Sequence, residues 1–302
     1  MRRMVCTAFA LMLAVTAPSR ADTLGHVASG GVERNFLIHV PAKLPPHPAL
    51  VLVFHGGGGT PAGMARLTGF DALADQHGFV VVYPQGLERH WNDGRSTIKN
   101  KVDDVGFVTA LVVQLTARYA IDPARIYATG MSNGAIFTNF LGCRMAGTFA
   151  AIAPVAGSLA VGMTPGCEPA GPLSVLMIAG TADPIMPFDG GAVRNFHGHG
   201  EGGYVLGAGH SAAFWQFIDG CAGTSAPLYP APLVANDLTR LEIYKATGCR
   251  AGFDVQEINV LLAGHVWPGG PQYLPKFIIG PDSHQMNASA AITDFFLAHP
   301  RP

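Results

Sequence analysis

Residues 126–135 read IYATGMSNGA, and no other stretch of the chain is as informative about its fold. Its first half is rich in β-branched and aromatic residues and predicts a strand, and a helix is expected to follow GMSNG at residues 130–134. Glycine two positions before and two positions after the serine allows a turn so sharp that larger side chains would collide. The pattern predicts a nucleophile elbow with Ser132 as the nucleophile. In a chain with 38 glycines a surface turn is the alternative interpretation, so the surrounding segments decide.

A glycine-rich loop precedes this stretch in the chain. The apolar run ALVLVF at residues 49–54 predicts a buried strand, and HGGGG follows at residues 55–59. Glycines leave backbone N–H groups unobstructed, which suits the oxyanion hole of an acyl-transfer site. We expect its donors to be the amide of Asn133, directly after the serine, and an amide from the loop at Gly57 or Gly58.

Two further segments place a carboxylate and an imidazole after predicted strands. LSVLMI at residues 173–178 leads into AGTADP, which carries Asp183, and VQEINVLL at residues 255–262 leads into AGHVWPGG, which carries His265. Ligands gather at the carboxyl ends of strands in open α/β sheets, so these side chains are expected near Ser132.

The order serine, aspartate, histidine along the chain is that of α/β-hydrolases. A serine hydroxyl is a weak nucleophile at neutral pH, so an imidazole must remove its proton and a carboxylate must orient that imidazole. Ser132, His265 and Asp183 are therefore the predicted nucleophile, base and acid. Such a site requires no metal and no cofactor, and we expect neither.

Six ordered motifs identify a family resemblance. HGGGG, WND, DDVGF, GMSNG, GTADPIMPF and GHVWPGG occur in this order, and the chain resembles the secreted polyhydroxybutyrate depolymerase and feruloyl esterase family, which includes carbohydrate esterase family one. The resemblance spans about residues 31–299. It implies an α/β-hydrolase fold, ester hydrolysis and a triad of Ser132, Asp183 and His265. Ala179 and Val266 depart from the residues that relatives often carry there, histidine and threonine, but neither removes a triad member.

The expected function is hydrolysis of carboxylic esters, with a polyhydroxybutyrate-type polyester or oligoester as the first substrate class. A feruloyl or acetylxylan esterase acting on plant cell-wall polysaccharide is the alternative. An acyltransferase or peptidase using the same residues, and a binding protein that kept only the fold, remain further alternatives. Expected substrate contacts are His55, Trp91 and Trp267, the two tryptophans as aromatic walls or as simple core packing.

The first 21 residues have the pattern of a secretory signal peptide. Arg2 and Arg3 precede an apolar stretch at residues 4–15, and small residues follow at the positions that a signal peptidase reads, so cleavage is expected after Ala21. The apolar stretch is short for a membrane span, and an uncleaved anchor is the alternative. We expect a secreted protein, extracellular or periplasmic, that has no membrane attachment after cleavage.

Composition agrees with one exported enzyme domain over residues 22–302. Loss of Arg2, Arg3 and Arg20 shifts the formal net charge from −1 to −4, and no basic block is present, so nucleic acid is not an expected partner. Hydrophobic residues make up 49% of the chain, enough for a sheet covered on both faces. The expected partner is the ester substrate.

Four cysteines remain after Cys6, which lies in the signal segment. An even number in an exported chain suggests two disulfides, and four cysteines allow three connectivities. We prefer the nearest neighbours along the chain, Cys143 with Cys167 and Cys221 with Cys249, which also fits the family resemblance. Four buried free thiols are the alternative.

Alternating strands and helices predict a mostly parallel central sheet with helices on both faces. Further strands are expected at residues 36–40 and 78–83, and helices at residues 105–119, 135–145, 212–218 and 288–298. Asp103 and Asp104 precede one of these helices, and capping of its N-terminus is preferred over catalysis. His197, His199, Glu201 and His210 match no strong metal signature, and a solvated loop near the site, able to act as a lid, is expected there.

Overall fold

The computed structural model describes residues 22–167, 169–195 and 201–302. The predicted signal peptide, residues 1–21 with Cys6, lies outside the described residues, and so do His197 and His199. Within the described ranges, no helix has both the length and the apolar character needed to cross a membrane.

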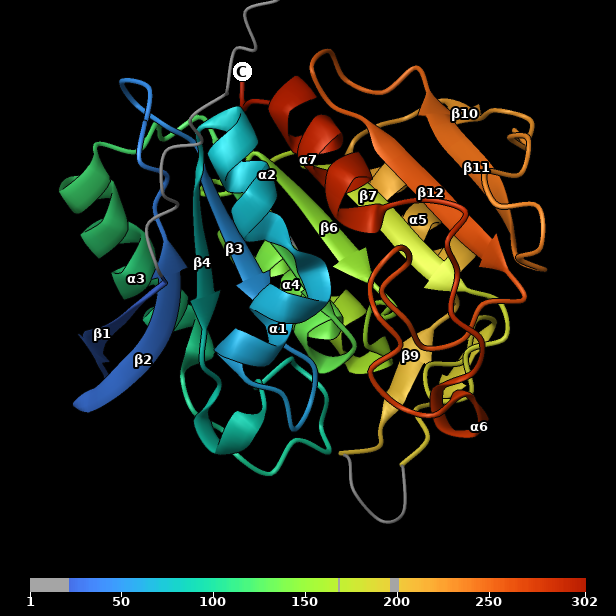
Figure 1. Cartoon of the computed structure of the whole chain (residues 1–302), viewed down its shortest axis with the longest axis horizontal. Helices are drawn as coiled ribbons and strands as arrows, with labels where there is room; N and C mark the ends of the chain where they lie inside the picture. The colour runs from blue at the N-terminus through green and yellow to red at the C-terminus, as the bar shows by residue number, and fades with distance from the viewer. Residues whose placement is uncertain (1–21, 168, 196–200) are drawn as a thin grey trace, which may run out of the picture.

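The central sheet has ten strands, in the order β1-β2-β4-β3-β5-β6-β7-β12-β11-β10, and a separate hairpin pairs β8 with β9 (Figure 1). The strands are Thr23–Ser29 (β1), Val32–His39 (β2), Leu50–Phe54 (β3), Val80–Pro84 (β4), Ile126–Met131 (β5), Ala151–Val155 (β6), Ser174–Gly180 (β7), Gly190–Ala192 (β8), Tyr204–Leu206 (β9), Gly223–Thr224 (β10), Arg240–Thr247 (β11) and Val255–Leu261 (β12). The six strands from β4 to β12 pair in parallel, whereas both edges of the sheet are antiparallel. The expected mostly parallel sheet is confirmed.

Helices cover both faces of this sheet. They are Pro61–Thr68 (α1), Phe70–His77 (α2), Asp104–Tyr119 (α3), Asn133–Met145 (α4), Ala208–Ile218 (α5), Lys276–Ile279 (α6) and Ala288–Ala298 (α7), with short 3₁₀ turns at Leu87–Arg89 (η1) and Val161–Gly166 (η2). Side chains of α3, α4 and α5 share one core cluster, and side chains of α1, α2 and α7 share the other. Figure 1 shows α2 and α7 in front of the sheet and α4 behind it.

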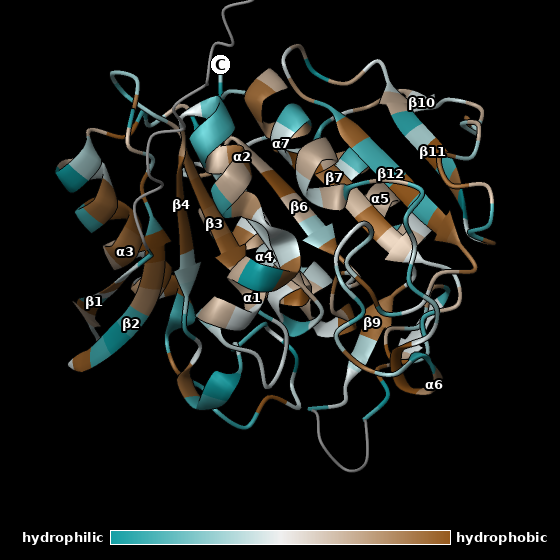
Figure 2. Cartoon of the chain, in the orientation of Figure 1, coloured by the Kyte–Doolittle hydropathy of each residue, from teal (hydrophilic) through white to brown (hydrophobic). Residues whose placement is uncertain are grey.

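Burial explains why the central strands are continuous apolar runs. Every residue of β3, β4, β5 and β6 is buried, because helices exclude water from both faces of the sheet. In Figure 2 the central strands β3, β4 and β6 are mostly brown, while more teal residues lie on β11 near the sheet edge. The two clusters fix the sheet between the helix layers, so the loops after the parallel strands leave it at one common edge.

Asp103 and Asp104, at the start of α3, have different structural roles. Asp103 accepts a 2.8 Å hydrogen bond from the Gly106 amide, which confirms its capping role. Asp104 is buried and instead accepts from Arg34 Nη2 at 2.6 Å and from the Asn92 amide at 2.8 Å. The second carboxylate therefore ties α3 to β2 and to the WND stretch.

Two disulfides join Cys143 with Cys167 and Cys221 with Cys249, the expected pairs. The first links the end of α4 to the residue after η2, and the second links the chain after α5 to the chain after β11. The first bridge therefore joins the connections on either side of β6, and the second joins those on either side of β10 and β11.

Candidate active site

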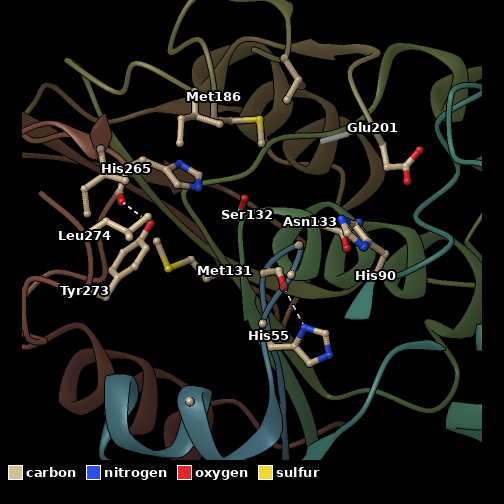
Figure 3. A pocket seen from close by; sticks show the side chains of 18 of the residues that line it. His55, His90, Met131, Ser132, Asn133, Met186, Glu201, His265, Tyr273 and Leu274 are labelled. Carbon is tan, nitrogen blue, oxygen red and sulfur yellow. Dashed lines mark hydrogen bonds between the residues drawn. The ribbon is translucent and has the colours of Figure 1, made fainter. Parts of the chain in front are cut away.

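Ser132 lies between β5 and α4 in a strained backbone conformation, with φ 59° and ψ −122°. The positions two residues before and two residues after Ser132 require glycine: a Cβ on Gly130 would lie 2.6 Å from the Gly134 carbonyl oxygen, and a Cβ on Gly134 would collide with the Phe54 carbonyl oxygen. The strain and the missing side chains together produce the elbow, since few residues can adopt this turn. Ser132 lines a cavity of about 620 Å³ at the edge where the parallel strands end (Figure 3).

Asp183 follows β7 and is held by two backbone amides. Its Oδ1 accepts from the amides of Ile185 and Met186, both at 2.8 Å, and its Oδ2 lies 2.6 Å from Nδ1 of His265. A carboxylate only accepts, so Nδ1 carries the hydrogen and, in the neutral ring, Nε2 is the basic nitrogen. This is the arrangement that a general base needs.

His265 follows β12 and lines the same cavity as Ser132. Its side chain is only 3% exposed, and its backbone carbonyl accepts a 2.9 Å hydrogen bond from the Tyr273 hydroxyl. Burial, and to a smaller extent the charge of Asp183, raises the pKa of Tyr273, so this hydroxyl stays protonated and keeps donating. The structure thus places Ser132 and His265 on one cavity, with Asp183 bonded to His265 behind it.

Gly57 and Gly58, the two glycines expected to donate to the oxyanion, differ in their hydrogen bonding. The amide of Gly58 already donates to the Arg89 carbonyl at 2.8 Å, and the amide of the following residue, Gly59, donates to the Gly56 carbonyl at 2.9 Å. The prediction that Gly58 donates to the oxyanion is therefore wrong, because its amide hydrogen is already bonded to the Arg89 carbonyl. Among the described residues no backbone acceptor takes the amide of Gly57, which lines the cavity. Gly57 and Asn133, whose amide begins a helix and has no intrahelical partner, remain the candidates.

A buried polar network holds Asn133 in place. Its Oδ1 accepts from the Trp91 amide at 2.9 Å, while its Nδ2 donates to the Trp91 carbonyl at 3.1 Å and to Asp93 Oδ2 at 2.6 Å. Asp93 is fully buried and paired with Arg95. Sequence reasoning gave Asp93 and Arg95 no role, although WND was recognised as a motif. They fix the residue whose amide follows the nucleophile.

His55 is a structural wall of the cavity and not a free substrate contact. It is 1% exposed, its Nδ1 donates to the Gly56 carbonyl at 2.8 Å, and its Nε2 accepts from the Gly86 amide at 3.0 Å. Burial lowers the pKa of His55 to about 4, which keeps the ring neutral at physiological pH. Both ring nitrogens are occupied, so the expected substrate role is corrected to one of joining two loops.

The two tryptophans expected as aromatic walls lie in the core. Trp91 is fully buried, donates its indole N–H to the His55 carbonyl at 2.9 Å and stacks on Phe137. Trp267 is 2% exposed and donates to Ser289 Oγ at 2.9 Å. Neither lines the cavity, so the packing interpretation holds and the wall interpretation is wrong.

The cavity instead has an aliphatic part and a polar part. Its described aliphatic lining comprises Met64, Leu67, Met131, Ile185, Met186, Val193, Leu274, Ile278 and Ile279. Tyr273 supplies the one phenyl-type ring in the described lining, and His90, Arg95, Arg194, Asn195 and Glu201 supply polar groups. Most of these side chains lie on loops after the strands and show no periodic sequence signal.

One group of metal-ligand type occurs in the described ranges, away from this cavity. Atoms of Asp22, His39 and Asp71 lie within 4.8 Å of one another. His39 uses one nitrogen on Asp22 and the other on Asp75, while Asp71 accepts from the Tyr83 hydroxyl at 2.7 Å. Their ligand-type atoms are thus engaged in hydrogen bonds within the protein, and the bond between His39 and Asp75 links β2 to α2.

Comparison with known proteins gives consistent matches. A family model described as "Esterase PHB depolymerase" matches residues 37–200. The chain is 30% identical over 288 residues to "Putative esterase NocK" of Nocardia uniformis subsp. tsuyamanensis, which covers 91% of this chain and 82% of the relative. It is 29% identical over 194 residues to feruloyl esterase B of Piromyces equi, covering 62% of this chain but only 34% of that relative.

A solved structure supports the architecture. The acetyl xylan esterase from Aspergillus awamori superposes with a TM-score of 0.61 over 91% of this chain and 99% of that one, at 15% sequence identity. At this identity the likeness concerns the fold alone, and the expected α/β-hydrolase fold is confirmed.

Proposed function

The chain belongs to the esterase PHB depolymerase family and is a carboxylic ester hydrolase, and from that premise we propose that Ser132, His265 and Asp183 carry out the hydrolysis. The observation that carries this proposal is the 2.6 Å bond between Asp183 and His265 at a cavity that the strained Ser132 also lines. Any one of these residues alone would be weak support. Their convergence from three separate strand ends supports an acyl-transfer site.

The proposed mechanism has two halves. Ser132 Oγ attacks the ester carbonyl carbon while His265 Nε2 takes its proton, and Asp183 stabilises the resulting imidazolium. The amides of Asn133 and Gly57 donate to the oxyanion, and the imidazolium then protonates the departing alkoxide, leaving an acyl-enzyme. Water, deprotonated by the same imidazole, attacks the acyl carbonyl carbon, and the imidazolium then returns that proton to Ser132 Oγ as the acid is released.

An aliphatic ester is the favoured substrate, of the hydroxybutyrate polyester or oligoester class. The cavity lining is mainly aliphatic, and methionine and branched side chains adapt to flexible chains better than to a flat aromatic ring. The matching family description also names polyhydroxybutyrate depolymerases. A feruloyl or acetylxylan esterase is the second candidate, because feruloyl esterase B is among the relatives.

Export is part of the proposal. Residues 1–21 carry the signal-peptide pattern, residues 22–302 would form one catalytic domain, and two disulfides tie that domain together. Disulfides persist in oxidising compartments, which agrees with an extracellular or periplasmic esterase.

Product release from three substrates tests the function. Wild type, Ser132→Ala and the matched control Ser96→Ala, an exposed serine, would receive 3-hydroxybutyrate oligomers, methyl ferulate and acetylated xylan. Mass spectrometry should detect 3-hydroxybutyrate with wild type and the control and none with Ser132→Ala. Serine-dependent release of ferulate or acetate alone would favour the second candidate. No serine-dependent product from any substrate would contradict the triad proposal.

A further inference from the structure

The turn after β4 is strained although it contains no glycine at the strained positions. Glu88 has φ 52° and Arg89 has φ 62°, both in the left-handed region that side chains disfavour. Such strain persists only where surrounding bonds hold it, and it concentrates at functional sites. Here the Arg89 carbonyl accepts from the Gly58 amide at 2.8 Å, and Arg89 Nε donates to the Gly59 carbonyl at 3.2 Å. The turn is thus fastened to the glycine loop of the cavity.

The result of this strain is the placement of His90. Directly after it, the Trp91 backbone is fixed to Asn133, and His90 lines the cavity with its side chain half-buried. Figure 3 shows His90 beside Asn133, on the side of Ser132 opposite His265. A Cβ on Gly57 would lie 3.0 Å from His90 Nε2, so glycine at that position leaves room for the imidazole.

The hydrogen bonding of the ring defines what it can offer. His90 Nδ1 lies 3.1 Å from the Glu88 carbonyl oxygen, which can only accept, so Nδ1 carries the hydrogen. In the neutral ring Nε2 then presents a lone pair. Among the described residues Nε2 has no hydrogen-bond partner, although His90 lines the cavity.

We propose that His90 Nε2 accepts a hydrogen bond from a hydroxyl on the acyl part of the substrate. The alkoxide leaving group must lie near His265 to receive its proton, so the opposite side of Ser132 is left for the oxyanion and the acyl chain. His90 adjoins Gly57, the expected oxyanion donor, which places the recognised hydroxyl within a few atoms of the scissile carbonyl. This inference rests on the proposed function and deepens it, because it selects esters whose acyl unit carries a free hydroxyl, as at the hydroxyl end of a hydroxybutyrate oligoester, over esters of unsubstituted acids.

A pair of esters that differ by one hydroxyl tests this role. Methyl 3-hydroxybutyrate and methyl butyrate share chain length and leaving group, so the ratio of their kcat/KM values isolates the hydroxyl. His90→Phe keeps a planar ring but removes the acceptor, and this ratio should fall about tenfold, the effect of one neutral hydrogen bond. His90→Gln offers an oxygen near the position of Nε2 and should keep the ratio within about threefold of wild type. His210→Phe, an exposed histidine on α5, is the matched control and should leave the ratio unchanged.

The other outcomes separate the two proposals. Circular dichroism and the thermal midpoint check that His90→Phe folds like wild type. If its ratio of kcat/KM values is unchanged, whether or not both esters lose activity equally, His90 only supports the loop. This outcome would overturn the inference while ester hydrolysis stands. If wild type hydrolysed neither ester, the hydroxybutyrate class favoured under the proposed function would be contradicted, and this inference would fall with it.

Discussion

Asp183 shows how one side chain can serve structure and chemistry through different atoms. One oxygen binds two backbone amides, and the other faces His265. We therefore expect Asp183→Asn to fold normally, because an amide oxygen can still accept from Ile185 and Met186. Its NH₂ group would donate to Nδ1 and force the ring hydrogen onto Nε2, the wrong tautomer, so kcat should fall about 10⁴-fold.

Steady-state kinetics on an activated ester beside thermal unfolding checks this prediction. Asp189→Asn, at an exposed aspartate six residues further on that does not line the catalytic cavity, is the matched control and should retain wild-type kcat. If Asp183→Asn kept kcat within tenfold of wild type, the carboxylate would not orient the base.

Among individual residues, the sequence could predict those that belong to motifs. Ser132, Asp183 and His265 each follow an apolar run, so their arrival at one edge follows from parallel strands. The state of Gly58 could not be predicted, because its amide is taken by Arg89, 31 residues away in the chain. The burial of Trp91 likewise depends on its stacking against Phe137, which no local pattern encodes.

His55 connects the loops that follow β3 and β4. Its pKa is lowered by burial from 6.5 to about 4 in the folded state. Between these values the unfolded chain binds more protons than the folded one, so stability rises with pH. The contribution of His55 is therefore complete above pH 6.5 and is lost as the pH falls toward 4, by about 3 kcal/mol in the free energy of unfolding.

Urea unfolding of wild type and His55→Gln at several pH values measures this contribution. The neutral glutamine should lower stability at pH 7.5 but flatten its decline between pH 6.5 and 4, whereas His26→Gln, at an exposed histidine on β1, should follow the wild-type curve. Parallel curves for wild type and His55→Gln would show that His55 does not titrate in this range.

The elements that were predicted share strong periodicity or complete burial. The helix expected at residues 105–119 is Asp104–Tyr119, and the strand expected at residues 255–262 is Val255–Leu261. β6 was not predicted, because it is five residues long and contains Pro154, which argues against a central strand. The helices α1 and α2 were also missed, since each has only eight residues and Gly69 separates them with φ 64°.

One sheet separates two cores, and the loops that line the cavity leave this sheet at a single edge. The core containing α4 supports the nucleophile from behind, and the core containing α1 and α7 packs on the opposite face. The loops after β3, β4, β5, β7 and β12 all contribute to the cavity, so its shape depends on the register of five strands. This is why pocket residues could not be assigned from local sequence.

The disulfides stabilise this arrangement by closing long connections. Cys143 and Cys167 are 24 residues apart, and restricting the unfolded chain over such a loop contributes about 3 kcal/mol. Replacement of both by alanine should lower the free energy of unfolding by about that amount, measured in urea. Wild type reduced with dithiothreitol should be less stable than the untreated variant, because reduction also opens the bridge between Cys221 and Cys249.

Peptide mapping without reduction provides the control for this prediction. It should recover Cys143 joined to Cys167 and Cys221 joined to Cys249, and in the double variant only the second pair. Unfolding that is unchanged by full reduction would show that packing of the two cores alone sets the stability. A lower free energy of unfolding in the reduced or substituted protein would instead show that the disulfides supply this part of the stability. The sheet alone does not hold the chain together at the ends of α4 and β11, where the bridges lie.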